Sequence, residues 1–356
     1  MNIAKTGSGL NVPVVTVLDD AGEIIEADQR RLIRYVIQSG AGANSLFLSG
    51  TTGEFAYLTN GQRQRLIEIG CEEIRTVNAQ LPTDSAPPVE AWAGVTAPTK
   101  AETLENLALA AHLQADMAVI APMAIEDLLP DEIVRFFQRE VAERIGADGS
   151  LTVALYDNPD IAPDSAMLHN IPTAIVEELN ELRFVVCLKA STTRDVLQSH
   201  LRISLANSAP HSFDVYVGNA SLIFEYEDIQ REAGVSADHL ALAGVVAGPA
   251  NLLPREWRAA WQAVVDRNAV LLGRYQKVLT RFDEMCFIGE GAARAYKGVA
   301  VIKQALYNQR LISSPCVRRG TPALTADEAR RFDDELSVFL EELKRSLNVT
   351  SSLAAK

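Results

Sequence analysis

The stretch that decides the fold is Arg183-Phe184-Val185-Val186-Cys187-Leu188-Lys189, an apolar run that ends in a lysine. A nearly continuous apolar run of this length is typical of a strand in a parallel sheet that is covered on both faces. A buried ammonium group is costly unless it is paired or neutralised, so a lysine here tends to lose its proton and become a nucleophile. The ordinary alternative is a strand that ends at the surface with Lys189 exposed to water.

Similar apolar runs lie on both sides of this stretch, and amphipathic segments separate them. The predicted strands span residues 11–18, 44–49, 89–95, 115–121, 151–156, 183–189, 213–218 and 240–246. Strands that are each followed by a helical segment favour an α/β fold, a single (β/α)8 TIM barrel. An open doubly wound sheet is the alternative, but no Gly-x-Gly-x-x-Gly turn follows the first strand.

Capping residues mark the starts of several predicted helices. They are the capping boxes Thr59/Gln62 and Thr99/Glu102, the opening Pro130, the cap Ser191 and the pair Thr325/Glu328. After Val246 the pattern is helical throughout. We therefore expect a barrel with the catalytic site in residues 1–248, a C-terminal α-helical part packed on it in residues 249–348, and a frayed tail in residues 349–356.

Composition indicates a globular protein and restricts its partners. Of 356 residues, 48% are hydrophobic and 22% are charged, which supplies a sizeable core. The formal net charge of -13 argues against nucleic acid or an anionic membrane surface as a partner. No stretch is long and apolar enough to span a bilayer, and the N-terminus has no apolar signal core.

The cysteines and histidines give no sign of a metal site. The four cysteines lie far apart without a Cys-x-x-Cys pair, and the five histidines show no metal-binding spacing. We interpret the cysteines as reduced thiols of a cytoplasmic protein and expect neither a metal nor a cofactor. Cys187 should share the inward face of its strand with Lys189, and we assign it to the core because no histidine falls nearby.

Unusual residues follow several of the predicted strands at the same end. They are Gly50-Thr51-Thr52-Gly53-Glu54, Tyr156 with Asp157-Asn158-Pro159, Lys189, Gly218-Asn219-Ala220 and residues 244–248. In a TIM barrel the active site lies at the carboxyl ends of the strands, so these elements should meet at one rim. Scattered surface features would not fall there together.

Gly50 and Gly53 bracket the hydroxyl residues Thr51 and Thr52. Glycines permit a tight turn whose N–H groups point into one small space, and such a concavity binds a carboxylate. An ordinary strand-to-helix turn is the alternative interpretation. Tyr156 alone would be an unremarkable core aromatic, but opposite an amine it becomes a proton relay with the Thr51 hydroxyl as its next link.

The chemistry that these groups support is attack of an amine on a ketone. A free lysine has a pKa of about 10.4, and burial brings catalytic lysines to roughly 7–8. A neutral Lys189 amine would form an iminium with a carbonyl, and the iminium acts as an electron sink. A carboxylate pocket beside it selects a 2-oxo acid, of which pyruvate is the smallest common case.

The chain resembles the dihydrodipicolinate synthase / N-acetylneuraminate lyase family of class I, Schiff-base aldolases. The matching elements are residues 50–54, the turn from Tyr156 to Pro159, Lys189, Gly218, residues 244–251, Lys303-Gln304-Ala305-Leu306, Arg318/Arg319 and Pro322-Ala323-Leu324. The resemblance implies Lys189 as the Schiff-base residue, Tyr156 as acid and base, and Thr51 and Thr52 as holders of the substrate carboxylate. It also implies that the backbone at Gly218 and Val246 lines the pyruvate site, and that the chain forms a tetramer built as a dimer of dimers.

Several positions depart from the family patterns. Dihydrodipicolinate synthases carry an arginine where this chain has Ile161, and tyrosines where Met123 and Ala124 follow Pro122. An apolar residue at position 161 is more similar to the sugar-acid aldolases. Neuraminate lyases use acidic residues just after the seventh-strand glycine, where this chain has Asn219-Ala220-Ser221.

We therefore expect a class I lyase that forms a Schiff base between Lys189 and pyruvate or another 2-oxo acid. The expected reaction is aldol cleavage or condensation, or dehydration of a 2-oxo sugar acid. One alternative is 4-hydroxy-tetrahydrodipicolinate (dihydrodipicolinate) synthase, and another is a non-catalytic relative that binds a 2-oxo acid. The expected assembly is a homotetramer or homodimer, and the sequence does not name the aldehyde or sugar-acid partner.

Overall fold

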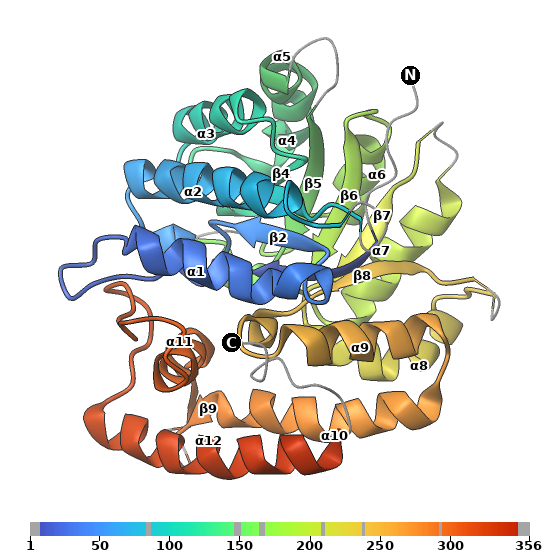
Figure 1. Ribbon diagram of the computed structural model, residues 1–356. Coiled ribbons are helices and arrows are strands. Elements are labelled where there is room, and N and C mark those ends of the chain that lie inside the picture. Colours follow the sequence, from blue (N-terminus) through green and yellow to red (C-terminus); the bar gives the residue numbers. More distant parts are fainter. Residues whose placement is uncertain are drawn as a thin grey trace.

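The protein is built on a closed barrel of eight parallel strands, in the order β1 to β8 with β1 paired to β8 (Figure 1). The computed structural model describes residues 8–82, 87–145, 151–163, 168–207, 211–236, 239–291 and 294–347. Helices lie between consecutive strands and cover the outside of the barrel. The predicted TIM barrel is therefore confirmed, and the open doubly wound sheet is wrong.

The strands fall on all eight predicted runs. They are β1 Gly9–Pro13, β2 Ser45–Leu48, β3 Glu90–Gly94, β4 Met117–Ile120, β5 Thr152–Asp157, β6 Val185–Ala190, β7 Asp214–Val217 and β8 Leu242–Val246. The first run was predicted too far along the chain, because β1 ends at Pro13 while residues 14–18 stay buried. Beyond the ladder this segment bonds to other groups: the Val15 N–H donates to Asn251 Oδ1 at 3.1 Å, and Thr16 Oγ1 donates to the Gly53 carbonyl at 2.6 Å.

The helices around the barrel begin near the predicted starts. They are α1 Glu26–Ile37, α2 Asn60–Asn78, α3 Lys100–His112, α4 Ile133–Phe136, α5 Ala142–Ile145, α6 Thr173–Asn180, α7 Arg194–Ala206 and α8 Tyr226–Glu232. A 3-10 turn from Pro130 to Glu132 opens α4, and a π turn from Phe137 to Val141 joins α4 to α5. The capping boxes Thr59/Gln62 and Thr325/Glu328 are both present and confirm the prediction.

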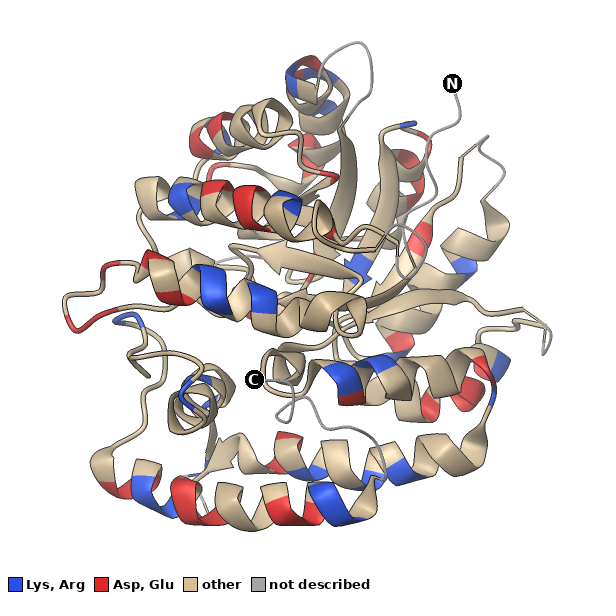
Figure 2. Cartoon of the chain, in the orientation of Figure 1, with Lys and Arg blue, Asp and Glu red and all other residues tan. Residues whose placement is uncertain are grey.

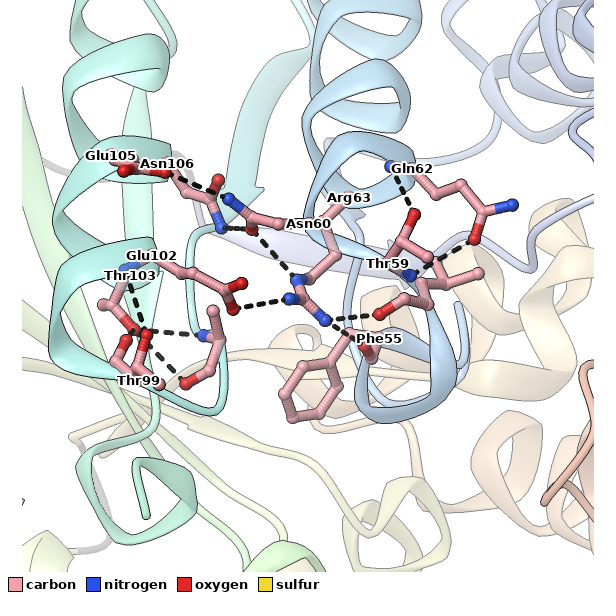
Figure 3. Close-up of polar contacts among 12 residues, drawn as sticks. Phe55, Thr59, Asn60, Gln62, Arg63, Thr99, Glu102, Thr103, Glu105 and Asn106 are labelled. Carbon is pink, nitrogen blue, oxygen red and sulfur yellow. Dashed lines mark hydrogen bonds and ion pairs between the residues drawn. The ribbon is translucent and has the colours of Figure 1, made fainter. Parts of the chain in front are cut away.

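The other two predicted caps need correction. Thr99 accepts the Glu102 N–H at 3.2 Å, but the Glu102 carboxylate binds Arg63 Nη2 at 3.0 Å instead of completing the box (Figure 3). A buried guanidinium is the stronger partner for this carboxylate. Ser191 does not cap α7, because the helix begins at Arg194 and Thr193 holds the N-cap position. Ser191 lies two residues earlier, where its N–H still continues the ladder by donating to the Asp157 carbonyl at 2.8 Å.

Four α-helices follow β8 in the described part of the chain. They are α9 Pro254–Val265, α10 Ala269–Met285, α11 Gly298–Asn308 and α12 Ala326–Ser346, with the two-stranded hairpin β9 Phe287–Ile288 and β10 Ala295–Tyr296 between α10 and α11. Helix α9 packs against β1, and the others pack on α9, on one another and on the turn after β8. Figure 1 shows α10 and α12 side by side beneath the barrel. The predicted C-terminal helical extension is confirmed, and the predicted tail, residues 349–356, lies outside the described residues. The boundary at residue 248 stays a proposal, because one apolar cluster joins barrel residues to Trp257, Phe282 and Phe339.

Most of the charged residues lie on the outer helices and the loops, whereas the strands carry few of them (Figure 2). A second apolar cluster fills the inside of the barrel, where the Trp92 and Tyr216 rings meet edge to face at 4.9 Å. Cys187 belongs to this inner cluster, as predicted, and burial raises the pKa of its thiol well above the ordinary value. No helix among the described residues is long and apolar enough to cross a membrane.

Candidate active site

Lys189 lies inside the barrel mouth, beside Tyr156 of the neighbouring strand. Tyr156 on β5 and Lys189 on β6 are register partners, so their side chains project from the same level of the barrel. Each residue is only 4% exposed. The Lys189 Nζ lies 3.5 Å from the centroid of the Tyr156 ring and 4.9 Å from that of Phe47. The alternative of a surface lysine is therefore wrong.

Burial and mutual contact shift the pKa values of both groups. Burial lowers the pKa of the Lys189 amine below its ordinary value, and the Tyr156 phenol only partly opposes the shift. For Tyr156, burial would raise the pKa, but the charge of Lys189 and hydrogen bonds from Lys189, Thr51 and Ser191 outweigh it and lower the pKa. An amine that loses its proton easily and a phenol that ionises easily can exchange a proton at this contact.

The Tyr156 hydroxyl has two further partners. It lies 3.0 Å from Thr51 Oγ1, as the predicted relay requires, and 2.8 Å from Asn158 Nδ2. The sequence analysis placed Asn158 in the turn after β5 but gave it no role. An amide two residues after a strand-end tyrosine and directly before a proline was the available signal, since such a turn folds the side chain back toward the strand.

The turn after β2 presents Thr51 and Thr52 to the mouth, but its glycines do not act as predicted. The left-handed residues of the turn are Ser49 (φ 54°) and Glu54 (φ 63°), while Gly50 and Gly53 are absent from the positive-φ residues. Gly50 is required for space, because a Cβ there would lie 2.6 Å from the Phe47 ring. Within the described part of the chain, the N–H groups of Thr51 and Thr52 have no backbone acceptor, so they are available to an anion.

Buried charges anchor this turn from two sides. The Glu54 carboxylate accepts a hydrogen bond from Lys303 on α11, and its Oε1 accepts the Arg318 N–H at 2.6 Å. On the other side the Arg63 guanidinium donates to the carbonyls of Phe55 at 3.1 Å and Leu58 at 2.6 Å (Figure 3). The C-terminal helices and α2 thus fix the position of Thr51 and Thr52.

Gly218 directly follows β7, and Val246 is the last residue of β8. A Cβ on Gly218 would lie 2.1 Å from the Ser191 hydroxyl oxygen, so only glycine lets that serine stand beside Tyr156. Val246 is 2% exposed and belongs to the same inner cluster as Tyr156. The structure therefore brings the predicted residues of all these strand ends to one mouth.

The wall beside Tyr156 is apolar. The turns Pro122–Ala124 and Pro159–Ile161 contact each other, and Ala124 and Ile161 both pack against the inner cluster. Met123 is buried in the main core at 8% exposure. The departures from the dihydrodipicolinate synthase pattern thus remove polar groups from this side of the mouth.

A histidine lies closer to the site than the sequence indicated. His200 on α7 places its Nε2 2.8 Å from Asp157 Oδ2, and both side chains are fully buried. The contact lies on the outer side of β5, where Asp157 Oδ1 also accepts the Ile171 N–H at 3.0 Å. It stabilises the end of the strand that carries Tyr156. Among the described residues, no group of three or more His, Cys, Asp or Glu could hold a metal ion.

A closed parallel barrel with a buried amine and phenol at its carboxyl-terminal mouth defines a TIM-barrel lyase of the aldolase type. The model of the Dihydrodipicolinate synthetase family matches residues 6–338, and the chain belongs to that family. Members of this family are pyruvate-dependent lyases and aldolases, which confirms the expected enzyme class.

Individual relatives are distant. A 4-hydroxy-tetrahydrodipicolinate synthase from Acidiphilium cryptum (strain JF-5) is 28% identical over 273 residues, which cover 72% of this chain and 75% of that protein. Two solved structures share the fold. YagE, a protein of the dihydrodipicolinic acid synthase family from E. coli K12 in complex with pyruvate, is 19% identical with a TM-score of 0.74, covering 94% of this chain and 99% of that one. The wild-type sialic acid aldolase of Ruminococcus gnavus is 16% identical with a TM-score of 0.75, covering 96% and 99%.

Proposed function

We propose that this protein is a class I lyase that binds pyruvate or another 2-oxo acid as a Schiff base on Lys189. The observation that carries the proposal is the buried amine of Lys189, 3.5 Å from the centroid of the Tyr156 ring, with the phenol in turn 3.0 Å from Thr51. A site that only binds a ligand has no need of an amine with a lowered pKa. The four unpaired cysteines support a cytoplasmic location.

The chemistry follows from the order of these groups. The neutral Lys189 amine attacks the C2 carbonyl. Tyr156 carries one proton from the amine nitrogen to the oxygen and supplies a second, so the oxygen leaves as water and an iminium remains. The iminium withdraws electrons, so the C3–C4 bond breaks as a base takes the C4 hydroxyl proton and an aldehyde leaves, or a C3 proton is lost; either step leaves an enamine. The enamine then adds to an aldehyde or takes up a proton. Hydrolysis of the iminium frees the 2-oxo acid and restores the amine.

The substrate carboxylate would be held by the turn after β2. The hydroxyls and N–H groups of Thr51 and Thr52 supply donors, and the backbone at Gly218 and Val246 closes the opposite side. The support is that a Cβ on Gly248, next to the end of β8, would lie 3.6 Å from Thr52 Oγ1, so the two strand ends approach each other closely. Donors fixed in a largely dry site bind a carboxylate more strongly than donors in water.

Borohydride trapping tests the proposal directly. Reduction in the presence of pyruvate should convert the iminium to a stable amine and add the corresponding mass to the peptide that contains Lys189. Absence of an adduct on that peptide would remove the proposed mechanism. Thermal stabilisation by pyruvate without any adduct would instead favour the non-catalytic relative.

The rate of adduct formation should rise with pH and level off below pH 10.5, the ordinary pKa of a lysine amine. Only the neutral amine attacks, and its fraction rises about tenfold per pH unit below the pKa. Because burial lowers the pKa of Lys189, the plateau is reached at a lower pH than for a free lysine. Initial trapping rates as a function of pH check this, and a rate that still climbs at pH 10.5 contradicts it.

The apolar wall favours a substrate without a second carboxylate on that side. Ile161 and Ala124 offer neither charge nor hydrogen bonds there. We therefore propose aldol cleavage or dehydration of a 2-oxo sugar acid ahead of 4-hydroxy-tetrahydrodipicolinate synthesis, which the Acidiphilium relative supports as the second candidate. Pyruvate release from a panel of sugar acids, compared with a coupled assay on pyruvate and aspartate semialdehyde, separates the two.

We propose that the working assembly is a homodimer or homotetramer. Membership of the Dihydrodipicolinate synthetase family supports an oligomer, and the exposed side chains of Tyr57 (48%) and Leu129 (60%) are candidates for burial by a second copy. Sedimentation of the purified chain reports the assembly state, and a single species with the mass of one chain at micromolar concentration contradicts the proposal.

A further inference from the structure

Besides Lys189 and Ser191, the Tyr156 hydroxyl has two side-chain partners of different capacity. A phenol carries one proton to donate and lone pairs to accept with. Thr51 Oγ1, at 3.0 Å, can act as donor or acceptor. Asn158 Nδ2, at 2.8 Å, can only donate. The direction of proton movement through Tyr156 therefore depends on whether the Asn158 amide is oriented with its nitrogen toward the phenol.

The backbone fixes that orientation. Asn158 Oδ1 accepts the Asp160 N–H at 3.1 Å, and a backbone N–H can only donate. The amide oxygen must therefore face Asp160, which leaves the nitrogen facing the phenol. Asn158 is only 6% exposed and lies between the buried Asp157 and the rigid Pro159. The donor is thus held in place before any substrate binds.

A fixed donor has two consequences at the phenol. One lone pair of the oxygen is occupied, so the phenolic proton is directed to the hydroxyl of Thr51 or Ser191 or to the reacting oxygen of the substrate. When Tyr156 ionises, the Asn158 N–H makes a charge-assisted hydrogen bond to the phenolate, which is stronger than the bond to the neutral phenol. The amide does not titrate, so this assistance is the same at every pH.

We propose that Asn158 is a positioning residue that donates permanently to Tyr156 and makes it both a directed acid and a ready base. The proposal rests on the function proposed above for Lys189 and Tyr156. It adds a partner from the turn after β5 to the groups that support the ionised phenol, which are Lys189, Thr51 and Ser191.

Two variants separate this role from simple packing. Asn158→Asp keeps the size of the side chain and the acceptor for the Asp160 N–H, but it replaces the donor with a carboxylate that repels a phenolate. Asn158→Ala removes both groups. The matched control is Asn180→Asp, because Asn180 is similarly buried at 4% exposure but donates to Asn207 Oδ1 at the end of α6, away from the mouth.

We expect both Asn158 variants to trap pyruvate about 10- to 100-fold more slowly, the effect of losing one hydrogen bond to a charged group. The midpoint of Tyr156 ionisation should move upward by about one pH unit or more, and further for Asn158→Asp than for Asn158→Ala. The Asn180→Asp protein should keep the wild-type midpoint and trapping rate. Slower trapping with an unshifted Tyr156 midpoint would mean a structural role only, and wild-type rates in both variants would overturn the proposal.

Ultraviolet titration of tyrosinate keeps this test independent of turnover. In the wild type, the Tyr156 signal is the difference between the titration curves of the wild type and of Tyr156→Phe. For each Asn158 variant, it is the difference between the curves of that variant and of the same variant carrying Tyr156→Phe. Its midpoint should be higher in the Asn158 variants even if the wild type traps no pyruvate. If the midpoint rises but the wild type traps no pyruvate, the proposed function fails and the hydrogen bond from Asn158 to Tyr156 is retained. An unchanged midpoint overturns the role of that hydrogen bond.

Discussion

Replacing Lys189 with methionine should abolish adduct formation with pyruvate and lower turnover by more than about 10³-fold, as loss of a covalent nucleophile does. Lys189 is the only lysine in the eight strands of the barrel, so no other amine projects from these strands at the mouth. Methionine fills nearly the same volume and prefers the apolar surroundings formed by Phe47 and the Tyr156 ring. We therefore expect the variant to fold, with a melting temperature equal to or above that of the wild type.

The stability readout distinguishes loss of chemistry from loss of structure. Burial lowers the pKa of Lys189, which means that the folded protein holds its charged form at a cost, and methionine removes that cost. Lys277→Met is the matched control, because Lys277 is exposed on α10. Mass spectrometry after borohydride reduction and a turnover assay provide the readouts. An adduct in the Lys189→Met protein, or turnover near the wild-type rate, would show that the nucleophile lies elsewhere.

Replacing Lys303 with methionine should lower the free energy of unfolding by about 3–5 kcal/mol, the cost of leaving a buried charge without its partner. The Lys303 and Glu54 side chains are 0% and 1% exposed, and Lys303 Nζ also donates to the Cys316 carbonyl at 2.8 Å. Without the ammonium group, the Glu54 carboxylate keeps only the Arg318 N–H among these partners. Urea unfolding followed by circular dichroism gives the free energy.

The double variant Glu54→Gln, Lys303→Met provides the decisive comparison. Glutamine still accepts the Arg318 N–H but carries no charge, so the double variant should recover most of the lost stability. If Lys303→Met does not fold, the double variant should still do so. Lys344→Met is the matched control, because Lys344 pairs with Glu341 on the exposed face of α12 and should leave the unfolding midpoint nearly unchanged. If the double variant is no more stable than Lys303→Met, the loss of stability does not come from the unpaired charge of Glu54.

The same pair should also affect binding, because it holds the turn that presents Thr51 and Thr52. Glu54 has a left-handed backbone at φ 63°, which a non-glycine residue adopts at a cost. The ion pair to α11 stabilises that conformation from outside the barrel. The sequence suggests that α11 only packs on the barrel, but the structure makes it part of the support of the turn that we propose binds the substrate.

Much of the site follows from the sequence because strand ends in a parallel barrel lie at one rim. Tyr156 and Lys189 end consecutive apolar runs, so adjacent strands bring them to the same level without further information. The turn that contains Thr51 follows the carboxyl end of β2, so the same rule places it at this rim. These residues could be predicted because the rule uses only the order of strands and the period of side chains along them.

Other features could not be predicted, because they depend on which groups meet across the folded chain. Ser191 is suited to cap a helix, but its N–H continues the ladder between β5 and β6, and the helix begins at Arg194 with Thr193 at the N-cap position. Glu102 is suited to complete a capping box, but its carboxylate instead accepts a hydrogen bond from Arg63 of the preceding helix. In both cases a stronger tertiary partner overrode a local preference.

The sequence by itself determined the barrel and the place of Lys189 at the end of a strand. Alternating apolar runs and amphipathic segments are local patterns, and Lys189 ends one of these runs. Only the tertiary structure decided that Lys303 meets Glu54, 249 positions away, and that the Asn158 amide turns its nitrogen toward Tyr156. The physical reason is that such contacts depend on how the barrel closes and how the C-terminal helices dock, and hydrogen-bond direction depends on partners that a linear pattern does not specify.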